Sequence, residues 1–291
     1  RRAPVLFGRT NRGEEWEPKN YDGKFDGPMR VRSALAKSKN MVSIRILRSI
    51  GPSYAQDYVT KFGFDAKQHP AYLTLALGAG QTNPMQMAAA YSVFANGGYR
   101  VKPYFIKTVV DTKGTVIFEE TPAAAGKDAE QAIDPRNAFI MTTLMRDVVR
   151  AGTATKALSL GRGDLAGKTG TTNDSHDAWF AGYNASLVGV AWVGFDQPKS
   201  LGERETGGGV ALPIWINYMK TALRGVAETP LKPPSGVVSA MSGGDPSGLT
   251  DTAGVSDWYY AEFPPKQFVD PLTGNSGSRN KQDDEVRQQL F

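Results

Sequence analysis

Leu165-Ala166-Gly167-Lys168-Thr169-Gly170-Thr171-Thr172 is the stretch around which the rest of the chain is organised. It predicts a short strand with a positive charge at Lys168, hydroxyls of Thr169 and Thr171 alternating onto one face, and no side chain at Gly170. We expect these polar groups to face one way and to receive a carboxylate. The bare glycine also lets another backbone approach, so an extended peptide could add beside the strand.

Two other interpretations of this stretch were open. Gly-Lys-Thr also ends a phosphate-binding loop, but that motif requires a glycine five positions before Gly167, where Arg162 stands. No apolar helix follows either, because residues 172–175 have the composition of a turn. A nucleotide site is therefore disfavoured, whereas an ordinary exposed strand that carries lysine and threonine stays open on the tripeptide alone.

The composition of the 291 residues is typical of a globular protein, with 40% hydrophobic and 22% charged residues. The net charge of +5 is compatible with an acidic polymer as a partner and does not imply nucleic acid. The absence of cysteine excludes disulfides and thiol catalysis, and two histidines cannot form a histidine-rich metal site, so we expect no metal or other cofactor. Ser175-His176-Asp177 spells a catalytic triad, but consecutive residues cannot converge, and we predict a surface turn there.

Apolar runs in the chain are too short for a membrane span, since the longest, residues 187–195, has the length of a strand. Arg1-Arg2 begins no signal peptide, and no methionine precedes it. We therefore interpret the chain as a piece of a longer product, and we expect any anchor or export signal to lie elsewhere in that product.

Helical periodicity predicts much of the first half of the chain. An amphipathic helix covers residues 31–50 and is interrupted at Ser38-Lys39-Asn40, where serine and asparagine compete for backbone hydrogen bonds and could point into a cleft. We expect a short helix capped by Ser53 and a further helix that starts at Asn83-Pro84. The clearest helix starts at Asp134-Pro135 and delivers the chain to the Lys168 strand.

Alternating patterns and turn signals predict strands over residues 104–111, 115–119, 178–183 and 187–195. The first two form a hairpin, and a mobile connector over 121–132 follows it. The last two form an antiparallel meander with the Lys168 strand, which keeps one side free for a guest peptide. After a last amphipathic helix from Pro213, the order of helices, strands and helix predicts an α+β fold.

Composition divides the chain into three parts. Residues 1–20 are an irregular lead-in, and residues 21–226 contain the periodic segments. Proline, glycine, serine and aspartate dominate residues 227–291, with Trp258-Tyr259-Tyr260 as a dense apolar patch. We therefore expect a C-terminal extension or linker in that last part.

Three stretches carry a family resemblance when they are taken together. They are Ala34-Leu35-Ala36-Lys37-Ser38-Lys39-Asn40, Asp164-Leu165-Ala166-Gly167-Lys168-Thr169-Gly170-Thr171-Thr172-Asn173 and Asp177-Ala178-Trp179-Phe180-Ala181-Gly182-Tyr183. Over about residues 20–224 the chain resembles the transpeptidase domain of class A, bifunctional penicillin-binding proteins. The resemblance implies the penicillin-binding/β-lactamase-like fold, an antiparallel sheet flanked by helices, which is incomplete in this chain.

The family pattern has Ser-x-x-Lys first, then Ser-x-Asn, then Lys-Thr-Gly. Ser38-Lys39-Asn40 and Lys168-Thr169-Gly170 match the last two motifs. A lysine stands three residues after a serine only at Ser278, ahead of Lys281, and this match follows the other motifs in a polar tail. We therefore expect the nucleophilic serine to lie upstream of Arg1.

The resemblance implies acyl transfer through a serine ester, with peptidoglycan stem peptides that end in D-Ala-D-Ala as substrates and β-lactams as acylating inhibitors. In that chemistry the Ser38 hydroxyl relays a proton to the leaving amine. Asn40 holds the substrate's amide and orients the lysine of the first motif. Lys168 supplies a positive field, and the Thr171 N–H is one half of the oxyanion hole.

Binding of the substrate's terminal carboxylate is the second role that the resemblance implies for this strand. The hydroxyls of Thr169 and Thr171 clasp the carboxylate, and Gly170 and Thr172 complete the substrate-binding stretch.

Partners and location also follow from the resemblance. It implies an upstream part of the same protein with the nucleophile, a glycosyltransferase domain and a membrane anchor, on the periplasmic side of the bacterial inner membrane. A D,D-carboxypeptidase or a β-lactamase-like hydrolase would carry the same motifs, so these alternatives stay open. A non-catalytic scaffold that binds peptidoglycan or β-lactams is the third alternative.

Overall fold

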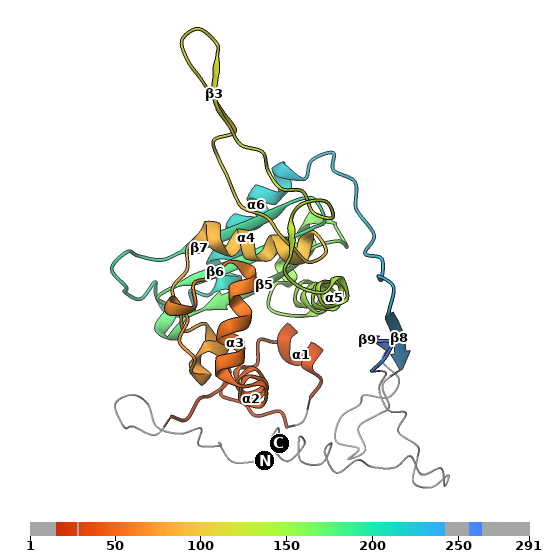
Figure 1. Ribbon diagram of the computed structural model, residues 1–291. Helices are drawn as coiled ribbons and strands as arrows, with labels where there is room; N and C mark the ends of the chain where they lie inside the picture. Colours follow the sequence, from red (N-terminus) through yellow and green to blue (C-terminus); the bar gives the residue numbers. More distant parts are fainter. Residues whose placement is uncertain (1–15, 28, 242–255, 264–291) are drawn as a thin grey trace.

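The computed structural model describes residues 16–27, 29–241 and 256–263, whose arrangement is shown in Figure 1. The α-helices are α1 (Val31–Ala36), α2 (Asn40–Ile50), α3 (Pro52–Val59), α4 (Pro84–Ala95), α5 (Pro135–Ala151) and α6 (Leu212–Ala222). The strands are β1 (Tyr99–Arg100), β2 (Thr108–Val110), β3 (Val116–Glu119), β4 (Glu130–Gln131), β5 (Ala166–Thr171), β6 (Ala178–Tyr183), β7 (Val188–Val193), β8 (Val237–Met241) and β9 (Ser256–Tyr260). None of the described helices has the combination of length and apolar content that crossing a bilayer requires.

The central sheet consists of β5, β6 and β7 in that order, with antiparallel neighbours. Lys168 pairs with Ala181, and Thr171 pairs with Ala178. This arrangement confirms the predicted meander and places the Lys168 strand at its edge. Within the described residues, β5 pairs with β6 alone, so its other edge is available for strand addition by an extended peptide.

Helix α6 covers one face of this sheet through Trp215. The indole ring packs edge-on against Phe180 with 4.9 Å between ring centroids, and Nε1 donates to the carbonyl oxygens of Gly182 and Gly189. A Cβ atom at either glycine would lie 2.8 Å from the Trp215 ring. Glycine at both positions therefore lets the large side chain lie directly on the strands.

Helices α4 and α5 cover the opposite face (Figure 1). Met145 from α5 packs with Ala166 and Tyr183 of the sheet, and Tyr91 from α4 meets the Tyr183 ring edge-on. The Tyr183 hydroxyl is hydrogen-bonded to Thr142 at 2.9 Å, so the one polar atom of this buried ring is satisfied. The two helical layers around the sheet confirm the predicted α+β class.

The predicted starts of α4 and α5 are confirmed by their caps. Asn83 accepts a hydrogen bond from the Gln86 N–H, and the Gln86 side chain accepts one from the Asn83 N–H, which forms a capping box. Asp134 accepts from the Arg136 N–H at the start of α5. These local signals were visible in the sequence because a cap depends only on residues within one turn.

One local prediction is wrong and another is incomplete. Ser53 does not cap α3, because the helix begins one residue earlier at Pro52, whose fixed φ suits the first turn and which has no N–H to satisfy. The connector over 121–132 is not irregular throughout, since Glu130–Gln131 (β4) pairs with Tyr99–Arg100 (β1).

A hairpin of β8 and β9 packs against the helices, within the part of the chain that we expected to be an extension or linker. Trp258 meets the Phe139 ring of α5 edge-on at 5.1 Å. Asp257 forms an ion pair with Arg32 of α1, and Arg32 also binds Asp147 of α5 at 2.9 Å. The hairpin therefore connects the first helix of the described chain to α5.

Candidate active site

Ser38 lies in the short loop between α1 and α2, as the predicted helix break required. Its φ of +53° is in the left-handed region, which non-glycine residues rarely adopt. The loop is held by backbone bonds, since the Ser38 N–H donates to Leu35 O and the Lys39 N–H donates to Ala34 O. The strained residue is thus fixed by its surroundings, a pattern that is common at functional sites.

Lys168 reaches this loop from the edge strand β5. Its Nζ donates to Ser38 Oγ at 2.7 Å and to the Thr169 carbonyl oxygen at 2.9 Å. Burial lowers the pKa of the Lys168 ammonium to about 8, because removal from water penalises the charged form. The structure thus brings Ser38 and Lys168 into direct contact, although 130 positions separate them in the sequence.

The hydroxyls of the β5 threonines have partners other than Lys168. Thr169 Oγ1 is hydrogen-bonded to Thr153 Oγ1 at 2.6 Å, and Thr171 Oγ1 accepts from the Gly207 N–H at 3.0 Å. In this structure Lys168 contacts the Ser38 loop, whereas the two threonine hydroxyls contact Thr153 and Gly207.

Gly170 and Thr172 lie beside these groups. A Cβ atom at Gly170 would be 3.2 Å from Trp179 Cβ, so the glycine keeps the strand close to its neighbour β6. Thr172 Oγ1 accepts from the Asp177 N–H at 2.7 Å and thereby closes the turn between β5 and β6. In this structure the Thr172 hydroxyl supports the turn.

Sequence analysis missed the contribution of Thr153, which follows α5. Its N–H donates to the Ala36 carbonyl oxygen at 3.1 Å, and its hydroxyl contacts Thr169. Gly152 permits this contact, since a Cβ atom there would lie 2.2 Å from Ala36 O. Thr153 therefore joins the end of α1 to the Lys168 strand, and the small residues at 152–154 were the only signal for it in the sequence.

The segment 19–26 is bound to the Ser38 loop by several polar contacts. Asn40 Nδ2 donates to Lys19 O at 2.9 Å, so the Asn40 amide nitrogen binds this segment. The buried Asn20 accepts from the Met41 N–H. Lys39, with 6% of its surface exposed, binds Asp22 at 2.7 Å and Asp26 at 2.6 Å.

We predict that these two aspartates stabilise the Ser38 loop by neutralising Lys39. Replacing both by asparagine leaves a buried cation unpaired and is expected to lower the free energy of unfolding by about 2 kcal/mol, less than for fully buried pairs because the aspartates are partly exposed. Adding Lys39→Met to this double variant should restore most of the loss in a urea titration. A triple variant as unstable as the double one would contradict this explanation.

Comparison with known proteins agrees with this geometry. Residues 8–220 match the family described as the penicillin binding protein transpeptidase domain. The chain belongs to this family. The predicted membership and the expected penicillin-binding transpeptidase fold are thereby confirmed.

Two of the curated relatives that this chain matches are named penicillin-binding protein 1A. The chain is 48% identical over 298 residues to the protein of Neisseria meningitidis serogroup A, and the alignment covers 99% of the chain. It is 41% identical over 307 residues to the protein of Pseudomonas aeruginosa, with 90% of the chain covered. In both cases the alignment spans only 37% of the relative's length.

Solved structures of penicillin-binding proteins share the fold. The crystal structure of penicillin-binding protein 1A from Haemophilus influenzae has a TM-score of 0.85 and 31% identity, and covers 92% of this chain and 45% of that one. The PonA1 protein from Mycobacterium tuberculosis, solved in complex with penicillin V, has a TM-score of 0.64 and 27% identity, with 79% of this chain and 64% of that one covered.

Proposed function

We propose that the chain provides the proton-relay and carboxylate-binding groups of a peptidoglycan D,D-transpeptidase. The observation that carries this proposal is the 2.7 Å hydrogen bond from Lys168 Nζ to Ser38 Oγ, beside an open strand edge. The nucleophilic serine belongs to another part of a longer protein. The relatives support this part of the proposal, because they are longer than the chain. Ser278, the serine of the Ser-x-x-Lys match, supports it as well, because it follows the other two motifs in the sequence instead of preceding them.

In the proposed reaction the nucleophilic serine gives its hydroxyl proton to the lysine of the Ser-x-x-Lys motif as its oxygen attacks the carbonyl between the last two D-alanines. The bond to the terminal D-alanine nitrogen then breaks. That nitrogen needs a proton to leave as an amine. Ser38 Oγ accepts its hydrogen bond from Lys168, so its own O–H hydrogen is free to be donated to the leaving nitrogen. The Lys168 ammonium stabilises the negative charge that develops on Ser38 Oγ.

The open edge of β5 suits the extended end of a stem peptide, which would add as a further strand. Lys168 and the hydroxyls of Thr169 and Thr171 are then available near its terminal carboxylate. The Thr171 N–H and the N–H of the nucleophilic serine would form the oxyanion hole, of which one donor is worth about 3 kcal/mol in the transition state. Asn40 would turn from Lys19 to the substrate's amide.

Transfer to an amine distinguishes this function from hydrolysis. The full-length protein is incubated with a peptide that ends in D-Ala-D-Ala, with and without an amine acceptor. A transpeptidase forms the cross-linked product with release of D-alanine. Free D-alanine without a cross-linked product would identify a D,D-carboxypeptidase, and rapid hydrolysis of penicillin would identify a β-lactamase. Absence of any covalent penicillin adduct would favour a non-catalytic scaffold.

The proposed location is the periplasmic side of the bacterial inner membrane, since the stem peptides are there. The membrane anchor and the glycosyltransferase domain would belong to the part of the longer protein outside these 291 residues.

The pH dependence of acylation tests the role of Lys168. The pKa of this ammonium is lowered to about 8, so its charge is lost as the pH rises through that value. We predict that the rate constant for acylation by penicillin falls above about pH 8. Lys168→Arg, if acylated at all, should show no such fall below about pH 10, because guanidinium keeps its proton beyond pH 12. A rate constant for the unaltered protein that stays constant to pH 10 would contradict the assignment.

A further inference from the structure

A cavity of about 440 Å³ lies between α3, the chain that enters α5, and β9. This volume is within the range of small-molecule sites in proteins. Its polar lining includes Tyr58, Lys61, Gln131, Asn137 and Tyr260. None of these residues has a role in the proposed acyl transfer.

The cavity and the candidate active site lie at opposite ends of α5. Asn137 is in the first turn of this helix, whereas Thr153, next to Thr169, follows its last turn. A helix of 17 residues is about 25 Å long. A ligand in the cavity therefore does not contact Ser38 or Lys168, so the two sites can be tested separately.

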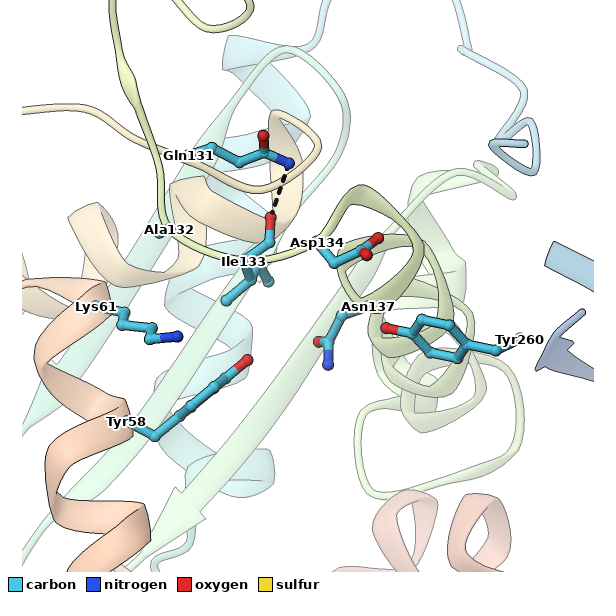
Figure 2. Close-up of a pocket in the computed structure, with 8 residues that line it drawn as sticks. All are labelled: Tyr58, Lys61, Gln131, Ala132, Ile133, Asp134, Asn137 and Tyr260. Carbon is cyan, nitrogen blue, oxygen red and sulfur yellow. Dashed lines mark hydrogen bonds between the residues drawn. The ribbon is translucent and has the colours of Figure 1, made fainter. Parts of the chain in front are cut away.

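The cavity offers both hydrogen-bond donors and acceptors next to aromatic rings. Figure 2 shows the polar ends of Tyr58, Lys61, Asn137 and Tyr260 pointing into the same space. The Asn137 amide and the Tyr260 hydroxyl lie on neighbouring sides of this space in Figure 2, and the amide offers both a donor and an acceptor. Burial raises the pKa of both tyrosines, so their hydroxyls stay protonated at neutral pH.

The charges around the cavity are balanced within the protein. Lys61 Nζ stands over the Tyr58 ring at 4.8 Å from its centroid. Arg136 binds Asp134 at 2.7 Å and Glu262 at 2.6 Å, and it stacks on the Tyr260 ring. The lining itself carries one cation, Lys61, and one carboxylate, Asp134, so its charges sum to zero and a neutral ligand suits it better than an ion.

Ala132 and Ile133 give the cavity an apolar floor, since both side chains are buried members of the core. A floor of this kind accepts a methyl group, while amides and hydroxyls above it match an acetamido group and sugar hydroxyls. Tyrosine rings can cover the apolar faces of a sugar ring and still offer a hydrogen bond from their hydroxyls.

We propose that this cavity, through Tyr58, Asn137 and Tyr260, binds a neutral N-acetylated sugar of a glycan strand. The proposal rests on the proposed function, since peptidoglycan carries its stem peptides on such a strand. It adds a glycan-binding site at the far end of α5 to the peptide-binding site at β5.

Saturation-transfer NMR on the full-length protein with chitotetraose, a β-1,4-linked oligomer of N-acetylglucosamine, tests the proposal. We expect saturation to reach the acetyl methyl protons. Asn137→Ala and Tyr260→Phe should each weaken binding by about fivefold, the effect of losing one hydrogen bond. Maltotetraose, which has no acetamido groups, should bind more weakly than chitotetraose.

Acylation by penicillin is measured on the same variants and should be unchanged, because neither residue contacts the active-site groups. Thermal unfolding of each variant shows whether the fold is retained. The glycan site would be overturned by any of three results. These are no saturation transfer to chitotetraose, binding of maltotetraose as strong as that of chitotetraose, or an unchanged affinity for chitotetraose in variants that are folded. Chitotetraose binding with the expected variant effects in a protein that penicillin does not acylate would instead overturn the proposed function.

Discussion

Replacing Ser38 by alanine is expected to slow acylation of the full-length protein by penicillin by about 10²- to 10⁴-fold, the usual contribution of a positioned proton donor or acceptor. The variant loses the hydroxyl that Lys168 Nζ contacts at 2.7 Å, so the departing nitrogen has no proton donor at that position. The adduct should still form slowly, since the nucleophile is a different serine. Intact-mass measurements over time give the rate constant.

Ser43→Ala is the matched control for this variant. Ser43 lies in α2, one turn after the loop, and its hydroxyl makes only a long contact of 3.5 Å to Lys39 O. We expect an unchanged rate constant and a stability within about 0.5 kcal/mol of the unaltered protein. If folded Ser38→Ala were acylated as fast as Ser43→Ala, Ser38 would have no role in proton transfer.

Gly207→Ala is expected to have a large effect on stability, because this glycine lies directly against the backbone of two strands of the central sheet. A Cβ atom at Gly207 would lie 2.3 Å from Trp179 O and 2.4 Å from Gly170 O, where only strand backbone could move. We expect a loss of about 2–3 kcal/mol in the free energy of unfolding, as for other overpacked sites. The β5 strand carries Lys168, so its displacement should also slow acylation by about 10²-fold.

Gly209→Ala provides the comparison within the same π-helical turn, η6 (Gly207–Ala211). Its Cβ atom would lie 3.2 Å from Thr206 Oγ1, a side-chain atom that can rotate away. We expect a loss below about 1 kcal/mol in a urea titration. Equal losses for both variants would show that the turn itself, and not the approach of Gly207 to the strands, determines stability.

The central sheet was predictable because its signals are local. Asn184 illustrates this, since its side chain accepts from the N–H groups of Ser186 and Leu187 and so fixes the turn between β6 and β7. The break at Ser38 and the caps at Asn83 and Asp134 likewise depend on neighbours within one turn. Ser53 misled the prediction because Pro52 starts the same helix one residue earlier.

Contacts between distant segments could not be read from the sequence in this way. Arg32 binds Asp257 across 225 positions, and no periodic pattern links these residues. The hydrogen bond between Thr153 and Thr169 depends on how α5 packs against β5, which propensities do not determine. Even the contact of Ser38 with Lys168 was expected only from the family resemblance and not from any local signal.

The position of the penicillin adduct tests the central claim most directly. The full-length protein is acylated with penicillin, digested, and mapped by tandem mass spectrometry. We predict that the adduct lies on a serine outside these 291 residues, and that Ser38→Ala carries the same adduct after a longer incubation. An adduct on Ser38 itself, or on Ser278, would contradict the claim that Ser38 and Lys168 assist a nucleophile from another part of the protein.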